Sequence, residues 1–209
     1  MFRKHLLWAS LALGSIVLSS APGVAVAQAD KWPASIRDFK FPFSGVMNDY
    51  WHGEIWRNTC GYGCYKHKNT YYPAAGYYSV DLVRDDGGST TGSYVLAPAR
   101  GIVSFAGRMD GYGWCVVMDH RNGWKSIVAH LQCDPNLFVS PGNDLLQGTL
   151  LGLAGKTDTT TPHIHFSVWK DNISVRLDGI SGGATIVDNG RYCSGNGFVS
   201  PPKGRTTCP

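Results

Sequence analysis

Residues 114–131 read WCVVMDHRNGWKSIVAHL, two apolar runs separated by a short polar turn. The runs at 114–120 and 124–131 are rich in Val, Ile and Trp, which favour β-strands. Between them, Asn122-Gly123 is the dipeptide that most readily accepts the positive φ angles of a tight hairpin turn. This stretch therefore predicts an antiparallel β-hairpin.

Similar runs lie on both sides of the hairpin. Strands are predicted at 94–96, 101–107 and 164–169, and glycines bound the second of these. Shorter apolar runs at 145–146 and 150–154 are separated by turn residues. Beyond the N-terminal segment, no helical period extends over more than two turns. Several short strands at close spacing predict a mainly β fold, an antiparallel sheet or sandwich.

Composition narrows the class of protein. The chain has 209 residues, which fits one domain, and 43% hydrophobic against 16% charged residues excludes a disordered chain. It contains 26 Gly, 11 Pro and 12% aromatic residues, which is typical of β-rich folds with many loops. The net charge of +4 is small and no run of Lys or Arg is present, so we expect no nucleic-acid partner.

The N-terminus has the features of an export signal. Basic residues at 3–5 precede an apolar run at 6–18 and a stretch of small residues that ends at Ala29. The alternative, a membrane anchor, needs about 20 apolar residues. We expect residues 1–29 to be a secretory signal and residues 30–209 to form a single domain. The protein is then secreted or periplasmic, with no membrane segment after cleavage.

The cysteine content fits an exported protein. All six cysteines follow the predicted signal, and an even number in an oxidising compartment predicts three disulfides. Other connectivities stay open, but three pairings are favoured. These are Cys60 with Cys64, Cys193 with Cys208, and Cys115 with Cys133. A zinc site made of four cysteines is the alternative, but the Cys-x-x-Cys spacing typical of such sites is absent.

The region 30–80 is rich in aromatic side chains and has no helical period. Two interpretations of it stay open. The aromatic rings form either the walls of a groove for an extended ligand or a satellite core of their own.

A pair of histidines gives the clearest chemical signal. Residues 162–166 read PHIHF, so on a strand His163 and His165 project from the same face. Two adjacent imidazoles can bind one metal ion, or one can bind the metal while the other acts on a water molecule. The alternative is a pair of exposed surface histidines.

Two more residues are unusual for their positions. His130 lies near the end of the apolar run 124–131, and Asp81 lies between Val80 and Leu82. A carboxylate in apolar surroundings is costly unless it is paired or binds a metal. Together with the histidine pair, these residues indicate a metal site.

Several short motifs occur in an order found in a known family. They are VLAPA (95–99), GIVSFAG (101–107), GYGW (111–114), VVMDH (116–120), NGW (122–124), AHL (129–131) and PHIHF (162–166). Together, over roughly residues 77–170, they resemble the lysostaphin-type zinc endopeptidases, which cut peptidoglycan cross-bridges. The resemblance implies a twisted antiparallel sheet with a groove across it, loops pinned by disulfides, and a bound zinc ion.

The first ligand pair departs from the usual pattern of that family, His-x-Gly-x-Asp. Residues 77–81 of this chain read YYSVD instead. The β-lytic and staphylolysin branch carries its ligand histidine further upstream, and here His67 lies fourteen residues before Asp81. The resemblance to this branch implies that zinc is held by His67, Asp81 and His165.

The same resemblance makes His130 and His163 the catalytic histidines, which flank the reacting water without binding the metal. One accepts a proton from the water, and the other stabilises the oxyanion or protonates the leaving amine. Which ring has which role stays open. We expect His120 to be structural, and His52 is the rival for a ligand or groove role.

Two functions from different classes follow. The first is a secreted, monomeric zinc metalloendopeptidase that hydrolyses the peptides of bacterial peptidoglycan. The second is a catalytically inactive wall-binding or regulatory module on the same fold, suggested by Tyr77 at the usual histidine position. The position of the His67 ring relative to Asp81 and His165 distinguishes the two.

Overall fold

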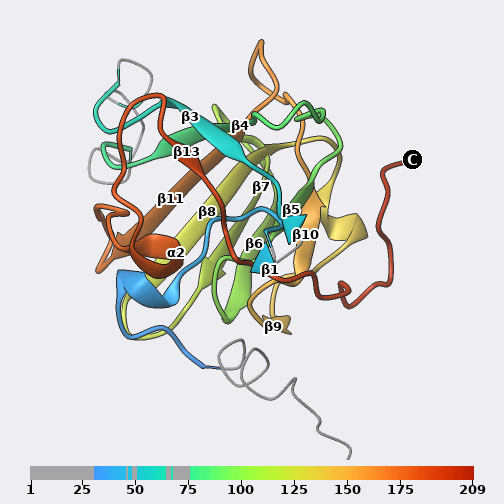
Figure 1. Ribbon diagram of the computed structural model, residues 1–209. Helices are drawn as coiled ribbons and strands as arrows, with labels where there is room; N and C mark the ends of the chain where they lie inside the picture. Colours follow the sequence, from blue (N-terminus) through green and yellow to red (C-terminus); the bar gives the residue numbers. More distant parts are fainter. Residues whose placement is uncertain (1–30, 46, 49–50, 65–66, 68–75) are drawn as a thin grey trace, which may run out of the picture.

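The computed structural model describes residues 31–45, 47–48, 51–64, 67 and 76–209 (Figure 1). Short strands dominate this part of the chain, which confirms the mainly β class. The strands are β1 (Met47–Asn48), β2 (Trp51–His52), β3 (Trp56–Cys60), β4 (Val80–Arg84), β5 (Tyr94–Leu96), β6 (Gly101–Met109), β7 (Gly113–Asp119), β8 (Trp124–Leu131), β9 (Asp144–Leu145), β10 (Leu150–Leu153), β11 (Ile164–Lys170), β12 (Ile173–Ser174) and β13 (Arg191–Tyr192). Two 3-10 turns, Ile36–Asp38 and Pro135–Leu137, and one short helix, α2 (Ile180–Gly183), complete the described elements.

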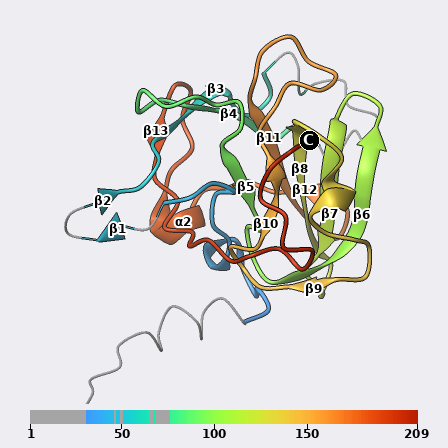
Figure 2. The same cartoon turned by 90° about the vertical axis from the view of Figure 1, so that its right-hand side faces the viewer.

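One large sheet forms the body of the molecule. Its strand order is β13-β3-β4-β11-β8-β7-β6-β9, with β12 beside β11, and the neighbouring strands pair antiparallel. The smaller pair of β10 with β5 packs beside it, and β1 pairs with β2 (Figure 2). The predicted antiparallel sheet is confirmed.

The hairpin of β7 and β8 forms as its sequence predicts. Val117 lies opposite Ile127, and Asp119 lies opposite Lys125. Residues 121–123 have φ angles of 64°, 48° and 79°, in the left-handed region that Asn and Gly accept most readily. The turn therefore sets the register of the two central strands.

The large sheet presents different residues to its two faces. On β11, Ile164, Phe166 and Val168 are fully buried in the main core, whereas His165 and Trp169 alternate with them and project from the opposite face. A smaller apolar cluster forms the floor of that opposite face. Its buried members are Tyr112, Cys115, Val117, Ile127 and Ala129. The metal-site candidates therefore lie on the face away from the main core.

Four aromatic residues of the N-terminal region belong to the main core. They are Phe39, Phe41, Phe43 and Trp56, and all are fully buried. Phe43 stacks between Phe41 and Trp56, with ring centroids 5.5 Å and 5.2 Å away. For these residues both interpretations of the sequence are wrong, because the rings pack into the sheet's own core. Four further aromatic residues lie outside the described part, namely Tyr50, Tyr65, Tyr71 and Tyr72.

Two disulfides form, rather than the three predicted. They are Cys60–Cys64, as predicted, and Cys133–Cys208. Cys115 and Cys193 are unpaired, so the pairings proposed for them are wrong. The Cys115 side chain is fully buried in the apolar floor of the sheet, where burial raises the pKa of its thiol to about 12. No second cysteine lies in that cluster.

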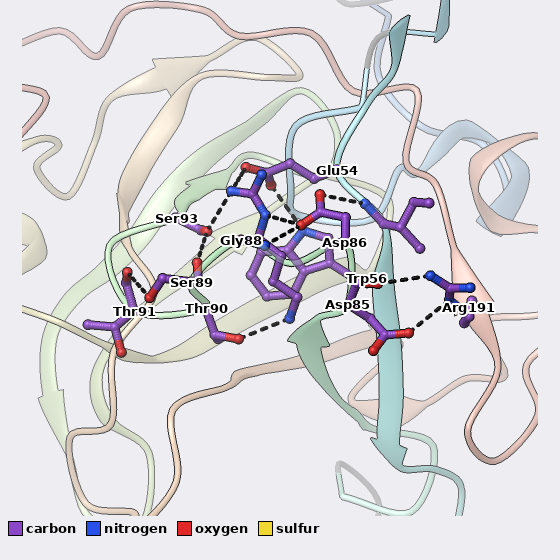
Figure 3. Close-up of polar contacts among 12 residues, drawn as sticks. Glu54, Trp56, Asp85, Asp86, Gly88, Ser89, Thr90, Thr91, Ser93 and Arg191 are labelled. Atoms are coloured by element: carbon purple, nitrogen blue, oxygen red, sulfur yellow. Dashed lines mark hydrogen bonds and ion pairs between the residues drawn. The ribbon is translucent and has the colours of Figure 1, made fainter.

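A polar network fixes the end of β4 away from Asp81 (Figure 3). The guanidinium of Arg84 lies 2.9 Å from Glu54 Oε1 and 2.7 Å from Asp86 Oδ1. Trp56 Nε1 donates to the other oxygen of Glu54 at 3.0 Å. These contacts tie β3 to β4 and so help to hold the strand that carries Asp81.

The predicted secretory signal lies outside the described residues and stays a prediction, as does the single domain at 30–209. In the part of the chain that the structure describes, we find no helix with the length and apolar character needed to cross a membrane.

Candidate metal centre

Asp81 and His165 are neighbours across two antiparallel strands. Asp81 of β4 lies opposite His165 of β11, so both side chains project from the same face. Asp81 Oδ1 is 3.1 Å from His165 Nδ1, and both residues are buried. Strand register thus brings together a carboxylate and an imidazole that are 84 residues apart in the sequence.

His67 reaches the same carboxylate from a loop. The loop contains the Cys60–Cys64 disulfide, and the backbone N–H of His67 donates to the Cys64 carbonyl at 2.8 Å. His67 Nδ1 lies 3.2 Å from the Gly61 carbonyl oxygen, and His67 Nε2 lies 3.2 Å from Asp81 Oδ1. A carbonyl only accepts hydrogen bonds, so Nδ1 carries the proton of the neutral ring and Nε2 presents its lone pair to the carboxylate.

The three side chains fit a divalent metal ion. His67, Asp81 and His165 each offer one donor atom, and these atoms all lie within 4.8 Å of one another. At 3.2 Å, the lone pair of His67 Nε2 and the Asp81 oxygen repel each other unless a cation or a proton lies between them. Two imidazole nitrogens and one carboxylate oxygen are a typical donor set for zinc.

The protonation states of these groups also favour metal binding. Burial acts to raise the pKa of Asp81, but the neighbouring imidazoles, His165 first and His67 next, outweigh it and hold that pKa well below its usual value. Burial lowers the pKa of His165, so its ring is neutral at neutral pH. A carboxylate and neutral imidazoles are the forms that bind metals.

Two further histidines lie beside these groups. The ring centroids of His130 and His163 are 4.6 Å apart, and His163 Nε2 is 3.6 Å from Asp81 Oδ2. His130 Nδ1 lies 2.8 Å from the Thr157 carbonyl oxygen. In the same way, His163 Nδ1 lies 2.8 Å from the Thr161 carbonyl oxygen. Each carbonyl holds the Nδ1 proton, which leaves the lone pair of each neutral ring on Nε2.

The backbone of His130 is unusual. Its φ angle is +61°, a backbone conformation that residues other than Gly rarely adopt. The register of β7 and β8 shifts here, so that Ala129 and His130 together face the single residue Cys115. Burial, followed by the charges of His165 and His163, lowers the pKa of His130 to about 4. The bulge thus places a neutral imidazole beside the histidine pair.

A pocket of ≈ 640 Å³ opens at the centre, and we call it the β3 pocket. Asp81 and His163 form part of its wall, and Arg57, Thr59 and Asp188 line it further out. It gives Asp81 and His163 access to solvent.

A second hollow of ≈ 620 Å³ lies across the sheet face from the β3 pocket. It is lined by Tyr112, Trp169 and Lys125 among others. The Tyr112 ring centroid is 5.4 Å from that of His165, so this hollow also begins beside the centre.

The structure brings every predicted site residue into one cluster. These residues are His67, Asp81, His130, His163 and His165. No sequence pattern indicates the groups that orient them, which are the backbone carbonyls of Gly61, Thr157 and Thr161, since any residue can supply a carbonyl. It also gave no direct sign of the bulge at His130.

The remaining histidines behave differently. His120 is fully buried, with Nδ1 2.6 Å from the Arg100 carbonyl oxygen and Nε2 2.7 Å from Ser126 Oγ. Its predicted structural role is confirmed. The side chain of His52, the predicted rival, lies outside the described part of the structure.

Comparison with known proteins gives a family likeness. Residues 85–177 match the sequence model of Peptidase family M23. This part of the chain is similar to the M23 peptidases. The match includes His130, His163 and His165 but begins after Asp81, so it does not cover His67 and Asp81, whose donor atoms converge with that of His165 in the structure.

Relatives of this chain include the protein named DD-carboxypeptidase/endopeptidase Mpg in Neisseria meningitidis serogroup B and Neisseria gonorrhoeae. Each is 36% identical over 76 residues, which is 36% of this chain and only 17% of the relative. A putative M23 peptidase structure from Pseudomonas aeruginosa covers 73% of this chain and 55% of its own, at 21% identity and a TM-score of 0.46. Lysostaphin from Staphylococcus simulans covers 57% of this chain and 47% of its own, at 20% identity and a TM-score of 0.41.

Proposed function

We propose that this chain is an exported zinc metalloendopeptidase that hydrolyses peptide bonds of bacterial peptidoglycan. The observation that carries the proposal is the convergence of the donor atoms of His67, Asp81 and His165 within 4.8 Å, with His130 and His163 beside them. The name of the Neisseria relatives, a carboxypeptidase and endopeptidase, supports a peptide of the cell wall as substrate.

The proposed chemistry divides between the metal and the two remaining histidines. A zinc ion held by His67, Asp81 and His165 would polarise the scissile carbonyl and lower the pKa of a bound water. Since carbonyls fix the Nδ1 protons of His130 and His163, Nε2 of one ring can accept the proton of the attacking water. The other ring, once protonated, can stabilise the oxyanion or protonate the departing amine.

The inactive wall-binding module is the second candidate. It is suggested by Tyr77, which replaces the usual ligand histidine and is 51% exposed. His67 Nε2 lies 3.2 Å from Asp81 Oδ1, so a histidine from further upstream reaches the same carboxylate. This contact favours the enzyme over the module.

The test combines metal content with hydrolysis. The exported chain is purified, its zinc content is measured by atomic absorption, and it is added to purified peptidoglycan. We expect stoichiometric zinc, loss of turbidity and release of new amino groups. Fully zinc-loaded protein that releases no amino groups from any peptidoglycan would favour the inactive module.

Replacing His130 or His163 by Ala tests the catalytic roles. We expect zinc to stay bound, because neither ring is a proposed ligand, while turnover falls by about 10²–10⁴-fold. Zinc content and turnover are measured on the same preparations. Loss of zinc in either variant would make that histidine a ligand and contradict the assignment.

A further inference from the structure

We propose that Asp188 is a specificity residue, which binds an ammonium group of the peptide substrate close to the bond that is cut. The proposal rests on the peptidase function above and concerns the β3 pocket. Asp188 belongs to the segment between α2 and β13, outside the region that matches the M23 family model.

Asp188 lies beside the metal centre. It lines the same pocket as Asp81 and His163. Its Oδ1 atom sits over Gly61 so closely that no Cβ would fit there. The carbonyl of Gly61 in turn accepts the hydrogen bond from His67 Nδ1 at 3.2 Å. A substrate group that contacts Asp188 would therefore be close to the proposed ligands and to His163.

The turn that carries Asp188 is held by Asn58 of β3, which is fully buried. Asn58 Nδ2 donates to the Val187 carbonyl at 3.1 Å. The backbone N–H of Asn189 donates to the Asn58 carbonyl, and that of Asn58 donates to the Gly190 carbonyl, both at 2.9 Å. The backbone on both sides of Asp188 is thus fixed, which positions its carboxylate at the pocket wall.

The carboxylate of Asp188 is unpaired, since no described residue donates a hydrogen bond to it or forms an ion pair with it. The other charged residue further out in the pocket is Arg57. The Arg57 guanidinium is held away from Asp188 by other partners: its Nε lies 3.5 Å from Asp85 Oδ1, a carboxylate that it shares with Arg191, and it donates a hydrogen bond to Asn189 Oδ1 at 3.3 Å. Among the described residues that line the outer part of the β3 pocket, Asp188 therefore offers a carboxylate that has no partner.

A negative charge in this place selects a cation, because opposite charges across an interface favour the correct partner and exclude others. In a peptide substrate an ammonium group is supplied either by the side chain of a diamino acid or by a free α-amino terminus. Both present the same chemistry to Asp188, and the peptides of the test distinguish them.

The test uses peptides that differ by a single acetyl group, which removes the charge of one amine. One carries Lys next to the scissile bond, a second carries Nε-acetyl-lysine there, and a third has its α-amino terminus acetylated. The variants are Asp188→Asn, which removes the charge, Asp188→Glu, which keeps it, and the control Asp171→Asn. Asp171 is an exposed carboxylate just beyond the end of β11 away from His165.

We expect wild type to prefer one ammonium-bearing peptide over its acetylated partner by about tenfold in kcat/KM, mainly through KM. Asp188→Asn should abolish the preference, whereas Asp188→Glu and Asp171→Asn should keep it. The preference should also shrink as salt is raised. Whichever acetylation removes it identifies the source of the ammonium group.

Equal use of all peptides by wild type, or a preference that survives in Asp188→Asn, overturns the proposal. So does an equal loss of kcat on every peptide or a loss of zinc in Asp188→Asn, because Asp188 would then only support the His67 loop. Binding of the same peptides is measured by calorimetry. If no peptide is cleaved but binding shows the charge preference and Asp188→Asn removes it, the inference holds and the peptidase function fails.

Discussion

Three of the four histidines at the centre are oriented by backbone carbonyls. His67, His130 and His163 each place Nδ1 against a carbonyl oxygen, at 3.2 Å, 2.8 Å and 2.8 Å. These contacts fix the tautomer, and so decide that Nε2 of each ring faces its neighbours. The tautomer of each ring is therefore set by the backbone carbonyl of another residue, and the side chain of that residue is not involved.

His67→Ala should abolish tight zinc binding. Asp81 and His165 would remain as the only protein ligands, and we expect the zinc affinity to fall by at least about 100-fold. Competition with a chromogenic chelator measures the affinity. The control is His120→Asn, which removes a buried histidine away from the centre and should leave the affinity unchanged. Full affinity in His67→Ala would contradict the ligand assignment.

His120 should make stability depend on pH. Burial lowers its pKa to about 4, although its hydrogen bond to the Arg100 carbonyl acts in the opposite direction. The unfolded chain has a histidine pKa of about 6.5, so between about pH 4 and 6.5 only the unfolded state binds this proton. His120 therefore lowers the free energy of unfolding as pH falls through this window, by up to about 1.4 kcal/mol per pH unit.

Urea unfolding of wild type and His120→Asn at several pH values measures this effect. Asn does not titrate, so the stability advantage of wild type should narrow as the pH falls from about 6.5 to about 4. Above that window the difference should be constant. A difference that is constant over the whole range would show that His120 does not remain neutral in the folded protein.

At the scale of elements, one ligand depends on a small loop whereas the others depend on strands. Asp81 and His165 are fixed by the pairing of β4 with β11, but His67 is fixed by its contacts with Cys64 and Gly61. The Cys60–Cys64 disulfide closes this loop and lies against His67, with Cys60 Sγ 4.0 Å from Nδ1.

The double variant Cys60→Ser, Cys64→Ser should bind zinc about 10–100-fold more weakly, because the contacts that orient a ligand contribute to affinity at this level. Replacing both cysteines also prevents free thiols from competing for the metal. Zinc affinity is measured by chelator competition, and circular dichroism checks that the strands persist. Unchanged affinity in a folded double variant would mean that the loop holds His67 without the disulfide.

The sequence predicts those elements whose geometry is local. The turn at Asn122-Gly123 and the alternation along β11 follow from neighbouring residues alone, and both are confirmed. The grouping of the site residues required the resemblance to a family, because His67 and His165 are far apart in the chain. The bulge at His130 escaped prediction, since it depends on how β7 and β8 align.

At the scale of the whole molecule, the C-terminal segment returns to the central sheet. Cys208 forms a disulfide with Cys133, which follows β8, across 75 residues of sequence. Val199 forms an isolated parallel β-bridge with Thr149, through backbone hydrogen bonds to the residues on either side of Thr149. This return explains why the sequence favoured the wrong partner for Cys208, since separation along the chain says nothing about where a long segment ends.

The double variant Cys133→Ser, Cys208→Ser should lose about 2–5 kcal/mol of stability, because the disulfide restricts the unfolded chain over a long loop. Its zinc affinity should be unchanged at temperatures where it is folded, since both cysteines pack against the main core and the ligands lie on the opposite face of the sheet. Chemical unfolding and chelator competition measure the two quantities. The two disulfide variants are thus controls for each other, and a loss of zinc affinity here would link the C-terminal segment to the centre.

On β11, a proposed ligand stands between two core residues, with Ile164 and Phe166 on either side of His165. Inserting or deleting one residue in this strand would therefore exchange its two faces. The imidazole of His165 would enter the apolar core, and the ring of Phe166 would be exposed to water. A chain in which this strand pairs in the wrong register would therefore lose both the packing of the main core and the proposed metal site. His165, Ser167 and Trp169 lie on the same face of the strand, so the number of residues between them has to stay as it is.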